Sequence, residues 1–201
     1  MAKRPVIVIH GGSCWAAYED YIKDLKGSKF EPDFSPRIGW QNNLQKSVGA
    51  DFKVLLPEMP NWRNAKYQEW KIWFEKALSA CRASPILVGH SLGAIFLAKY
   101  FSETVRACKI RGLCLVSTPF KTFTANPDFG DFALKGPPKR LGQFGKTIFF
   151  YQSEDDPIVS PDNLTHYHAV APDAVLRIFK KRKHFARNTF PELADDIRSI
   201  K

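Results

Sequence analysis

The chain has 201 residues, of which 44% are hydrophobic and 13% aromatic, and its formal net charge is +10. This length favours a single domain over residues 1–201, and the composition is ample for a buried core. No stretch approaches the roughly 20 apolar residues that a membrane span needs, and the first residues lead into an apolar run without the cleavage site of a signal peptide. We therefore expect a cytoplasmic protein without a membrane span.

The positive charges are scattered along the chain apart from one basic run, residues 180–183. No recognised nucleic-acid-binding motif accompanies them, so we expect no nucleic-acid partner. The run is either a solvated strand end or a positive rim that attracts anionic substrates. The cysteines show neither metal-type spacing nor a dense disulfide pattern, so we expect no cofactor and no metal, with Cys14 a bystander thiol. The four cysteines are Cys14, Cys81, Cys108 and Cys114.

Apolar and amphipathic segments alternate along the chain. Apolar runs typical of buried strands cover residues 6–9, 52–56, 86–88, 113–117, 147–151 and 174–179. Helices are expected over residues 42–48, 65–83, 94–101, 161–170 and 191–200. Strands that alternate with helices predict an α/β fold, with a parallel sheet covered on both faces.

Two segments raise separate expectations. The helix over residues 65–83 carries an apolar stripe that we interpret as core, formed by Trp70, Trp73, Phe74, Ala77, Leu78 and Cys81. Residues 120–145 leave the fourth strand at its carboxyl end and contain several phenylalanines and prolines. This segment is either a small lid or pocket wall over the site or a packed surface loop, and both interpretations stay open.

The most informative motif is GHSLG at residues 89–93, which lies between the apolar run 86–88 and the helix over 94–101. Gly-x-Ser-x-Gly between a strand and a helix is typical of a nucleophile elbow, a turn so sharp that only small residues fit two before and two after the serine. We expect Ser91 to be a nucleophile, exposed at the carboxyl end of its strand. The amide of Leu92 would point at the oxyanion that forms during attack.

A serine nucleophile needs a base, and the base needs a carboxylate that holds it in the right tautomer. An acidic loop, residues 154–156, follows the fifth strand, and His184 follows the sixth, so the chain offers serine, acid and histidine in that order. All three lie at carboxyl ends of strands, where open parallel sheets place their active sites. Of the other histidines, His10 and His90 are interpreted as braces of their loops.

Together these motifs resemble those of α/β-hydrolases. Within that superfamily the chain is similar to the small, nearly capless serine hydrolases related to retinoblastoma-binding protein 9. The resemblance implies a three-layer α/β-hydrolase fold with a minimal cap and about six mainly parallel strands in the order 2-1-3-4-5-6. The motifs that carry it are the elbow, LPEMP at 56–60, SEDDP at 153–157, and HF at 184–185 followed by TFPEL at 189–193.

The resemblance also implies site residues. In such hydrolases the acid lies three residues before the valine of Asp-x-x-Val, which selects Asp156 over Asp155. The implied catalytic triad is therefore Ser91, Asp156 and His184.

The oxyanion hole is implied in the same way. The His-Gly turn after the first strand gives the amide of Gly12, together with that of Leu92, and Ser13 is the alternative to Gly12. The chain departs from the group at the basic run 180–183, because a glycine or small residue often precedes the histidine. No Leu-x-Cys-x-Glu occurs, so retinoblastoma binding is not implied and any protein partner stays open.

We expect a serine hydrolase that cleaves a carboxylic ester of a small-molecule acyl substrate through a Ser-Asp-His triad and an acyl-enzyme intermediate. One alternative is an amide or short-peptide hydrolase with the same mechanism. The other is a protein-interaction module on a hydrolase scaffold with weak activity, because a fold does not guarantee a function.

Overall fold

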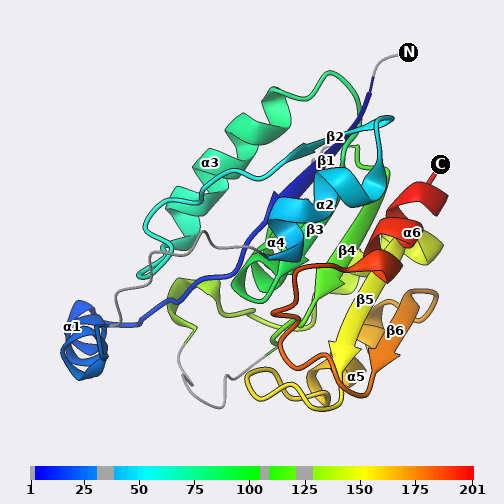
Figure 1. Cartoon of the computed structure of the whole chain (residues 1–201). Helices are drawn as coiled ribbons and strands as arrows, with labels where there is room; N and C mark the ends of the chain where they lie inside the picture. Colours follow the sequence, from blue (N-terminus) through cyan, green and yellow to red (C-terminus); the bar gives the residue numbers. More distant parts are fainter. Residues whose placement is uncertain (1–2, 31–38, 105–108, 121–128) are drawn as a thin grey trace.

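The computed structural model describes residues 3–30, 39–104, 109–120 and 129–201. Six strands form one sheet in the order β2-β1-β3-β4-β5-β6, and every neighbouring pair is parallel (Figure 1). The predicted α/β fold class and strand order are thereby confirmed. The strands are β1 (Arg4–Ile9), β2 (Phe52–Leu55), β3 (Ile86–His90), β4 (Gly112–Val116), β5 (Ile148–Ser153) and β6 (Val175–Phe179).

Helices cover both faces of the sheet (Figure 1). They are α2 (Trp40–Val48), α3 (Tyr67–Ser79), α4 (Leu92–Glu103), α5 (Asn163–Val170) and α6 (Pro191–Ser199). The α2 and α6 helices pack on one face, and α3, α4 and α5 pack on the other. Side chains alternate along a strand, so Val6 and Val8 of β1 join the first layer while Ile7 and Ile9 join the second.

The α4 helix is the most deeply buried helix of the fold, since residues 92–101 are all buried. A helix that is apolar on every side must be covered on every side. The sheet covers one side, and two short 3₁₀ segments, η1 (Gly130–Phe132) and η2 (Lys139–Thr147), contact it elsewhere. Within the described ranges, no helix combines the length and the apolar character that crossing a membrane requires.

The apolar stripe on α3 is only partly core. Trp70 and Phe74 are fully buried, but Trp73 is 44% exposed, so its assignment to the core is wrong. Successive helical residues are rotated by about 100°, which places Trp73 at the edge of the face that Trp70 and Phe74 share. Its ring is instead within reach of Lys76, whose ammonium lies 5.9 Å from the ring centroid.

The α1 helix (Tyr18–Gly27) was not expected from the sequence. None of its residues is buried, and it projects from the rest of the fold (Figure 1). Apolar residues nevertheless recur along it at steps of three and four, at Tyr18, Tyr21, Ile22 and Leu25. The helix pattern is therefore present in the sequence, and the sequence analysis overlooked it.

The segment over residues 120–145 packs into the core where it is described. Phe120, Phe129 and Phe132 are buried, and the Phe132 ring lies 5.2 Å from that of Trp70 in a T-shaped pair. Residues 121–128, on which the lid interpretation depends and which include Phe123, lie outside the described residues.

Candidate active site

The turn between β3 and α4 has the geometry of a nucleophile elbow. Ser91 has a φ of 56° and a ψ of −118°, a conformation that L residues rarely adopt. A Cβ on Gly89 would lie 2.6 Å from the Gly93 carbonyl oxygen, and one on Gly93 would lie 2.2 Å from the Ile9 carbonyl oxygen. These neighbours are backbone atoms that cannot swing aside, so the strand enters the helix this sharply only with glycine at both positions.

Ser91 is buried, with 6% of its surface exposed, so the expectation of an exposed serine is wrong. The loop after β1 covers it, and a Cβ on Gly11 would lie 3.4 Å from the Ser91 Cβ. The Ser91 N–H donates to the Val116 carbonyl oxygen at 2.9 Å. The serine is therefore fixed to the end of β4 as well as to β3.

The His184 ring faces Asp156. Its Nδ1 lies 3.1 Å from Oδ1 and 3.0 Å from Oδ2 of that carboxylate, whose side chain is fully buried. Because β5 and β6 pair in parallel, the loops that follow them meet at one edge of the sheet. A carboxylate in this position holds the proton on Nδ1 and leaves the Nε2 lone pair free to accept another.

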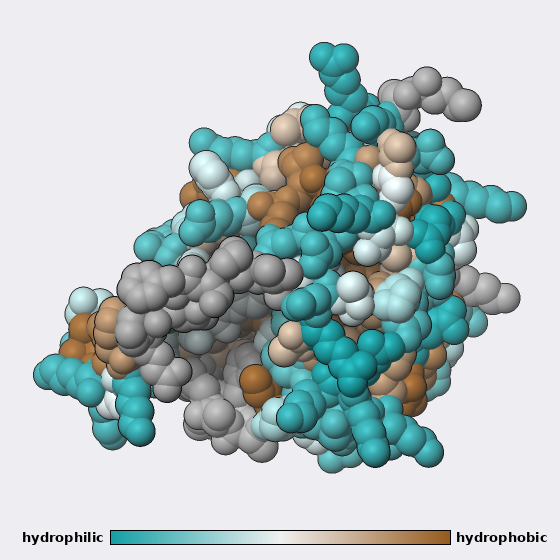
Figure 2. Space-filling model, viewed as in Figure 1, coloured by the Kyte–Doolittle hydropathy of each residue, from teal (hydrophilic) through white to brown (hydrophobic). Residues whose placement is uncertain are grey.

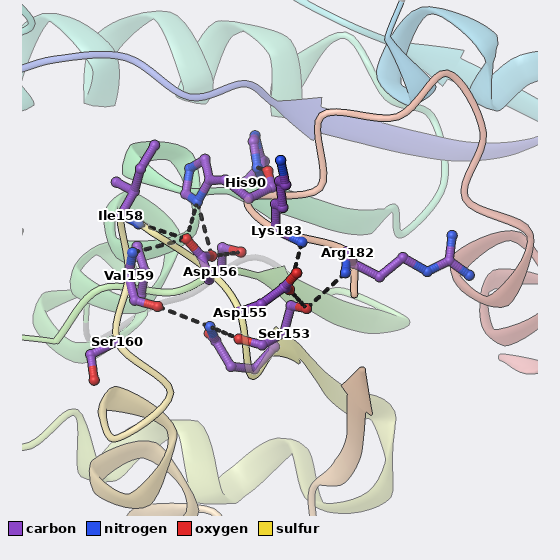
Figure 3. Close-up of polar contacts among 12 residues, drawn as sticks. His90, Ser153, Asp155, Asp156, Ile158, Val159, Ser160, Arg182 and Lys183 are labelled. Carbon is purple, nitrogen blue, oxygen red and sulfur yellow. Dashed lines mark hydrogen bonds and ion pairs between the residues drawn. The ribbon is translucent and has the colours of Figure 1, made fainter. Parts of the chain in front are cut away.

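Asp156 accepts hydrogen bonds from three further groups (Figure 3). The N–H groups of Ile158 and Val159 donate to Oδ1 at 2.9 Å and 3.0 Å, and the Ser117 hydroxyl donates to Oδ2 at 2.7 Å. Burial raises the pKa of the Asp156 carboxyl, but the bonds from His184, Val159 and Ser117 outweigh it and hold that pKa below its usual value. The carboxylate is therefore charged at neutral pH.

Asp155 has different partners (Figure 3). Its Oδ1 accepts the Ser153 hydroxyl at 2.6 Å and the Lys183 N–H at 2.9 Å, and these bonds lower the pKa of the Asp155 carboxyl. Asp155 therefore joins the end of β5 to the residue before His184, whereas Asp156 contacts the His184 ring itself.

Ser117 was missed in the sequence analysis. It is the residue after β4, it is fully buried, and its φ is 46°. Strain of this kind persists where the surroundings fix the backbone, and here the hydroxyl that it orients bonds Asp156. No motif marks such a serine, because its contact depends on the pairing of β4 with β5.

His90, the residue before the candidate nucleophile, was predicted to brace its own loop, and the structure shows that it also bonds the loop that carries His184. Its Nε2 lies 3.1 Å from the His184 carbonyl oxygen, and its Nδ1 lies 3.2 Å from Nε2 of Gln41 on α2. These partners assign Nε2–H as the donor and Nδ1 as the acceptor, so the ring is neutral. Burial, helped by the neighbouring His184, lowers the pKa of His90 to about 3.

The loop around His184 is strained and tightly bonded. Lys183 and Phe185 have φ values of 49° and 55°, in the left-handed region that favours glycine. Lys183 thus has a positive φ at the position where the sequence analysis noted a departure from the resemblance. The loop is held by the Arg182 N–H, which donates to Ser153 Oγ, and by the Phe185 N–H, which donates to the Arg182 carbonyl oxygen, both at 2.9 Å.

The two predicted oxyanion-hole residues are neighbours. Leu92 begins α4, so its amide has no acceptor within the helix. A Cβ on Gly12 would lie 3.3 Å from the Leu92 side chain and 2.5 Å from the Trp62 carbonyl oxygen, so only glycine fits. The Ser13 N–H donates to that same Trp62 oxygen at 2.8 Å, which favours Gly12 over Ser13.

The described cysteines lie in apolar surroundings, with Cys14 and Cys114 buried and Cys81 half-buried. Burial raises the pKa of the Cys114 thiol to about 12, which makes it a poor nucleophile. The described ranges contain no group of three or more His, Cys, Asp or Glu side chains that could hold a metal ion. Cys108 lies outside them.

A family model described as serine hydrolase matches residues 34–189. The chain belongs to the serine hydrolase family. With its fold, this makes it a hydrolase of the α/β-hydrolase superfamily. No curated protein sequence matches the chain. The narrower resemblance to hydrolases related to retinoblastoma-binding protein 9 stays a prediction.

Solved structures share the fold of the hydrolase. The ydeN gene product of Bacillus subtilis has a TM-score of 0.78 at 20% identity, with 98% of each chain covered. Naproxen esterase of Bacillus subtilis has a TM-score of 0.63 at 10% identity, covering 98% of this chain and 81% of that one. Monoacylglycerol lipase of Paleococcus ferrophilus has a TM-score of 0.59 at 14% identity, covering 98% and 95%.

A cavity of about 750 Å³ opens beside the elbow of the hydrolase. We call it the wide cavity; its wall includes Gly11, Trp40, Trp62, His90, Phe185 and Arg187. Gly11 adjoins Ser91 and His90 precedes it, so the cavity begins next to the candidate nucleophile. Its wall mixes apolar and polar side chains, and the polar ones include Gln41, Asn42 and Glu58.

Proposed function

We propose that this hydrolase cleaves a carboxylic ester through Ser91, Asp156 and His184, with an acyl-enzyme intermediate. The observation that carries the proposal is the contact of His184 Nδ1 with both oxygens of a buried, charged Asp156. The strained elbow at Ser91, whose preceding residue bonds the backbone of His184, supports the third member of the triad.

In the proposed mechanism, Ser91 Oγ attacks the ester carbonyl carbon and its proton passes to His184 Nε2. Asp156 stabilises the imidazolium. The amides of Gly12 and Leu92 donate to the oxyanion, and one such donor is worth roughly 2.7–4 kcal/mol in other hydrolases. The intermediate expels the alcohol, which takes the proton from His184. Water, deprotonated by His184, then releases the carboxylic acid and restores Ser91.

An ester is the proposed substrate class, since two structures with this fold are named an esterase and a lipase. We also propose that residues 1–201 form one domain and that the substrate is a small molecule that fits the wide cavity. A cytoplasmic location, and the absence of cofactor, metal and nucleic-acid partners, stay predictions from the sequence.

The test compares p-nitrophenyl butyrate with butyryl p-nitroanilide, which differ only in the ester and amide link. We expect kcat/KM for the ester to exceed that for the anilide at least 100-fold. Rapid mixing should release a burst of p-nitrophenolate equal to the enzyme concentration, the kinetic sign of an acyl-enzyme. Preferred cleavage of the anilide would favour the amide hydrolase, and no turnover of a panel of acyl-chain lengths would favour the interaction module.

A further inference from the structure

The segment between β6 and α6 concentrates positive charge. It contains Lys180, Lys181, Arg182, Lys183 and Arg187, all exposed except Arg182. Arg182 forms an ion pair with Glu192. Throughout the described part of the chain, no carboxylate lies within ion-pair distance of the other four. The surface over this segment is largely hydrophilic (Figure 2).

These side chains line a groove rather than a convex surface. The basic groove, about 480 Å³, is bordered by residues 180–183, by Ala186 and Arg187, and by Asp155. Asp155 contributes the one carboxylate of this wall, and its Oδ1 already accepts two hydrogen bonds. Because Arg182 is paired with Glu192, four cationic side chains remain beside the single carboxylate of Asp155, and the groove keeps a positive excess.

Hydrogen bonds fix the backbone of the loop and one of its cations, the Arg187 guanidinium. The Lys183 N–H donates to Asp155, and a guanidinium nitrogen of Arg187 donates to the Lys181 carbonyl oxygen, each at 2.9 Å. A loop whose backbone is already ordered loses less entropy on binding an anion than a free basic tail would.

The basic groove adjoins the wide cavity, because Ala186 and Arg187 line both. The wide cavity in turn reaches Gly11, beside Ser91, and its wall includes one carboxylate, that of Glu58. A small molecule whose carbonyl lies at Ser91 can therefore extend through the wide cavity to Arg187, and a terminal anion would then meet Lys181 and Lys183. Guanidinium and ammonium groups are the side chains that bind carboxylate and phosphate in proteins.

We propose that the ester substrate carries a terminal anionic group, a carboxylate or a phosphate, which binds in the basic groove. This inference rests on the proposed function, since it assigns the substrate class of the same site. Arg187, Lys181 and Lys183 are the specificity-determining residues. They do not take part in bond breaking.

The experiment measures a ratio, kcat/KM for mono-p-nitrophenyl glutarate divided by that for its neutral methyl ester. We expect a ratio of at least ten at 20 mM NaCl, and a smaller ratio at 500 mM because salt screens exposed charges. Two variants test the groove: a double variant, Lys181→Gln with Lys183→Gln, and a single variant, Arg187→Gln. Each should lower the ratio at least fivefold. The matched control, Lys23→Gln with Lys26→Gln on the exposed α1, removes the same charge elsewhere and should leave the ratio unchanged.

A wild-type ratio near one, or an equal fall in the control variant, would overturn the inference. A second substrate pair with phosphate in place of the carboxylate identifies the preferred anion. Preference for either anion over its neutral partner supports the inference, and preference for neither contradicts it.

A binding measurement distinguishes failure of this inference from failure of the proposed function. Titration of the Ser91→Ala protein with the glutarate ester and its methyl ester measures affinity without turnover. We expect at least fivefold tighter binding of the anion, lost in the Lys181→Gln, Lys183→Gln background. If the wild-type protein hydrolysed neither ester but this preference held, the proposed function would fail and the anion site would stand. Equal binding of both esters would remove the anion site.

Discussion

Two neighbouring carboxylates, Asp156 and Asp155, have different hydrogen-bond partners, and only Asp156 contacts the His184 ring. Asp156 contacts the His184 ring and receives three other hydrogen bonds, whereas its neighbour Asp155 bonds Ser153 and the backbone of Lys183. Asparagine at position 156 can present its amide N–H₂ to His184 and so favour the wrong tautomer. We expect Asp156→Asn to lower kcat for p-nitrophenyl butyrate by roughly 10⁴-fold, as in a related triad.

Asp155→Asn is the matched comparison, because it makes the same chemical change one residue away. It should lower kcat by less than tenfold, since the amide oxygen can still accept from Ser153 and Lys183. Both proteins should be checked for folding by circular dichroism before the assay. A larger loss from Asp155→Asn than from Asp156→Asn would mean that the acid has been assigned to the wrong residue.

Ser117 should act through Asp156 as a positioning residue. Its hydroxyl bonds Oδ2 at 2.7 Å, and a hydrogen bond to a charged group is worth about 1.5–3 kcal/mol. We expect Ser117→Ala to lower kcat at least tenfold, which corresponds to about 1.4 kcal/mol, with KM nearly unchanged.

The neighbouring Thr118 supplies the control for this prediction. Its hydroxyl is buried without a hydrogen-bond partner among the described residues, so Thr118→Val keeps the shape and loses no bond. Its kcat should stay within twofold of wild type. An equal fall in kcat for both variants would assign the effect of Ser117→Ala to general disruption of the strand end.

At the residue scale, the sequence identifies candidate catalytic residues that belong to a recognisable motif. Ser91, Asp156 and His184 could each be singled out because a nucleophile elbow, an Asp-x-x-Val loop and the chain order are visible in one dimension. The prediction that Ser91 is exposed was wrong, because the loop that covers it follows a different strand, β1. Ser117 could not be found, since its partner becomes a neighbour only when β4 pairs with β5.

Among the elements, the β3–α4 junction places the strictest limit on the sequence. A Cβ on Gly93 would lie 2.2 Å and 2.6 Å from the carbonyl oxygens of Ile9 and His10, so the end of β1 would have to move. We expect Gly93→Ala to reduce the free energy of unfolding by about 2–4 kcal/mol, measured by urea denaturation.

Gly27→Ala, at the end of α1, is the matched control because an added Cβ there meets no atom within 4 Å. Its free energy of unfolding should stay within about 0.5 kcal/mol of wild type. A Gly93→Ala protein as stable as the Gly27→Ala protein would show that the junction is looser than described.

The elements that bury the most apolar surface were the ones that the sequence predicted best. The central strands are continuous apolar runs because they are covered on both faces, and their observed bounds lie within two residues of the predicted ones. The exposed α1 carries a shorter stripe, Tyr18, Tyr21, Ile22 and Leu25, which was overlooked although it has helical spacing. Trp73 was misassigned because a step of three residues along a helix turns a side chain partly away from the face it appears to share.

For the whole molecule, the half-buried His90, whose ring is largely shielded from water, makes stability depend on pH. Its pKa of about 3 lies below the usual 6.5 of histidine, so between these values the unfolded chain binds a proton that the folded chain does not. Folding stability therefore falls as pH decreases from about 6.5 towards 3, with a slope of at most about 1.4 kcal/mol per pH unit. Urea denaturation at pH 7.5, 6.0 and 4.5 measures it.

The comparison is between His90→Gln and His168→Gln, which remove a half-buried and an exposed histidine. Glutamine can still donate from position 90 to the His184 carbonyl. The pH slope should flatten in His90→Gln and match wild type in His168→Gln. Identical slopes in all three proteins would contradict a shielded, neutral His90.

The sheet order of the whole molecule followed from the superfamily resemblance and is confirmed. The positive net charge by itself indicated no partner. Only the folded chain brings residues 180–183 and Arg187 to one groove that adjoins the wide cavity, because this neighbourhood depends on how the loops after β1, β3 and β6 meet.

The central claim is that Ser91 is a nucleophile activated by His184, and covalent labelling tests it most directly. The folded protein is treated with a fluorophosphonate probe, digested, and the adduct is located by mass spectrometry. We predict one adduct per chain, on Ser91, absent in Ser91→Ala and formed at least 100-fold more slowly in His184→Gln. Labelling of another residue, or unchanged labelling of the Ser91→Ala protein, would contradict the account.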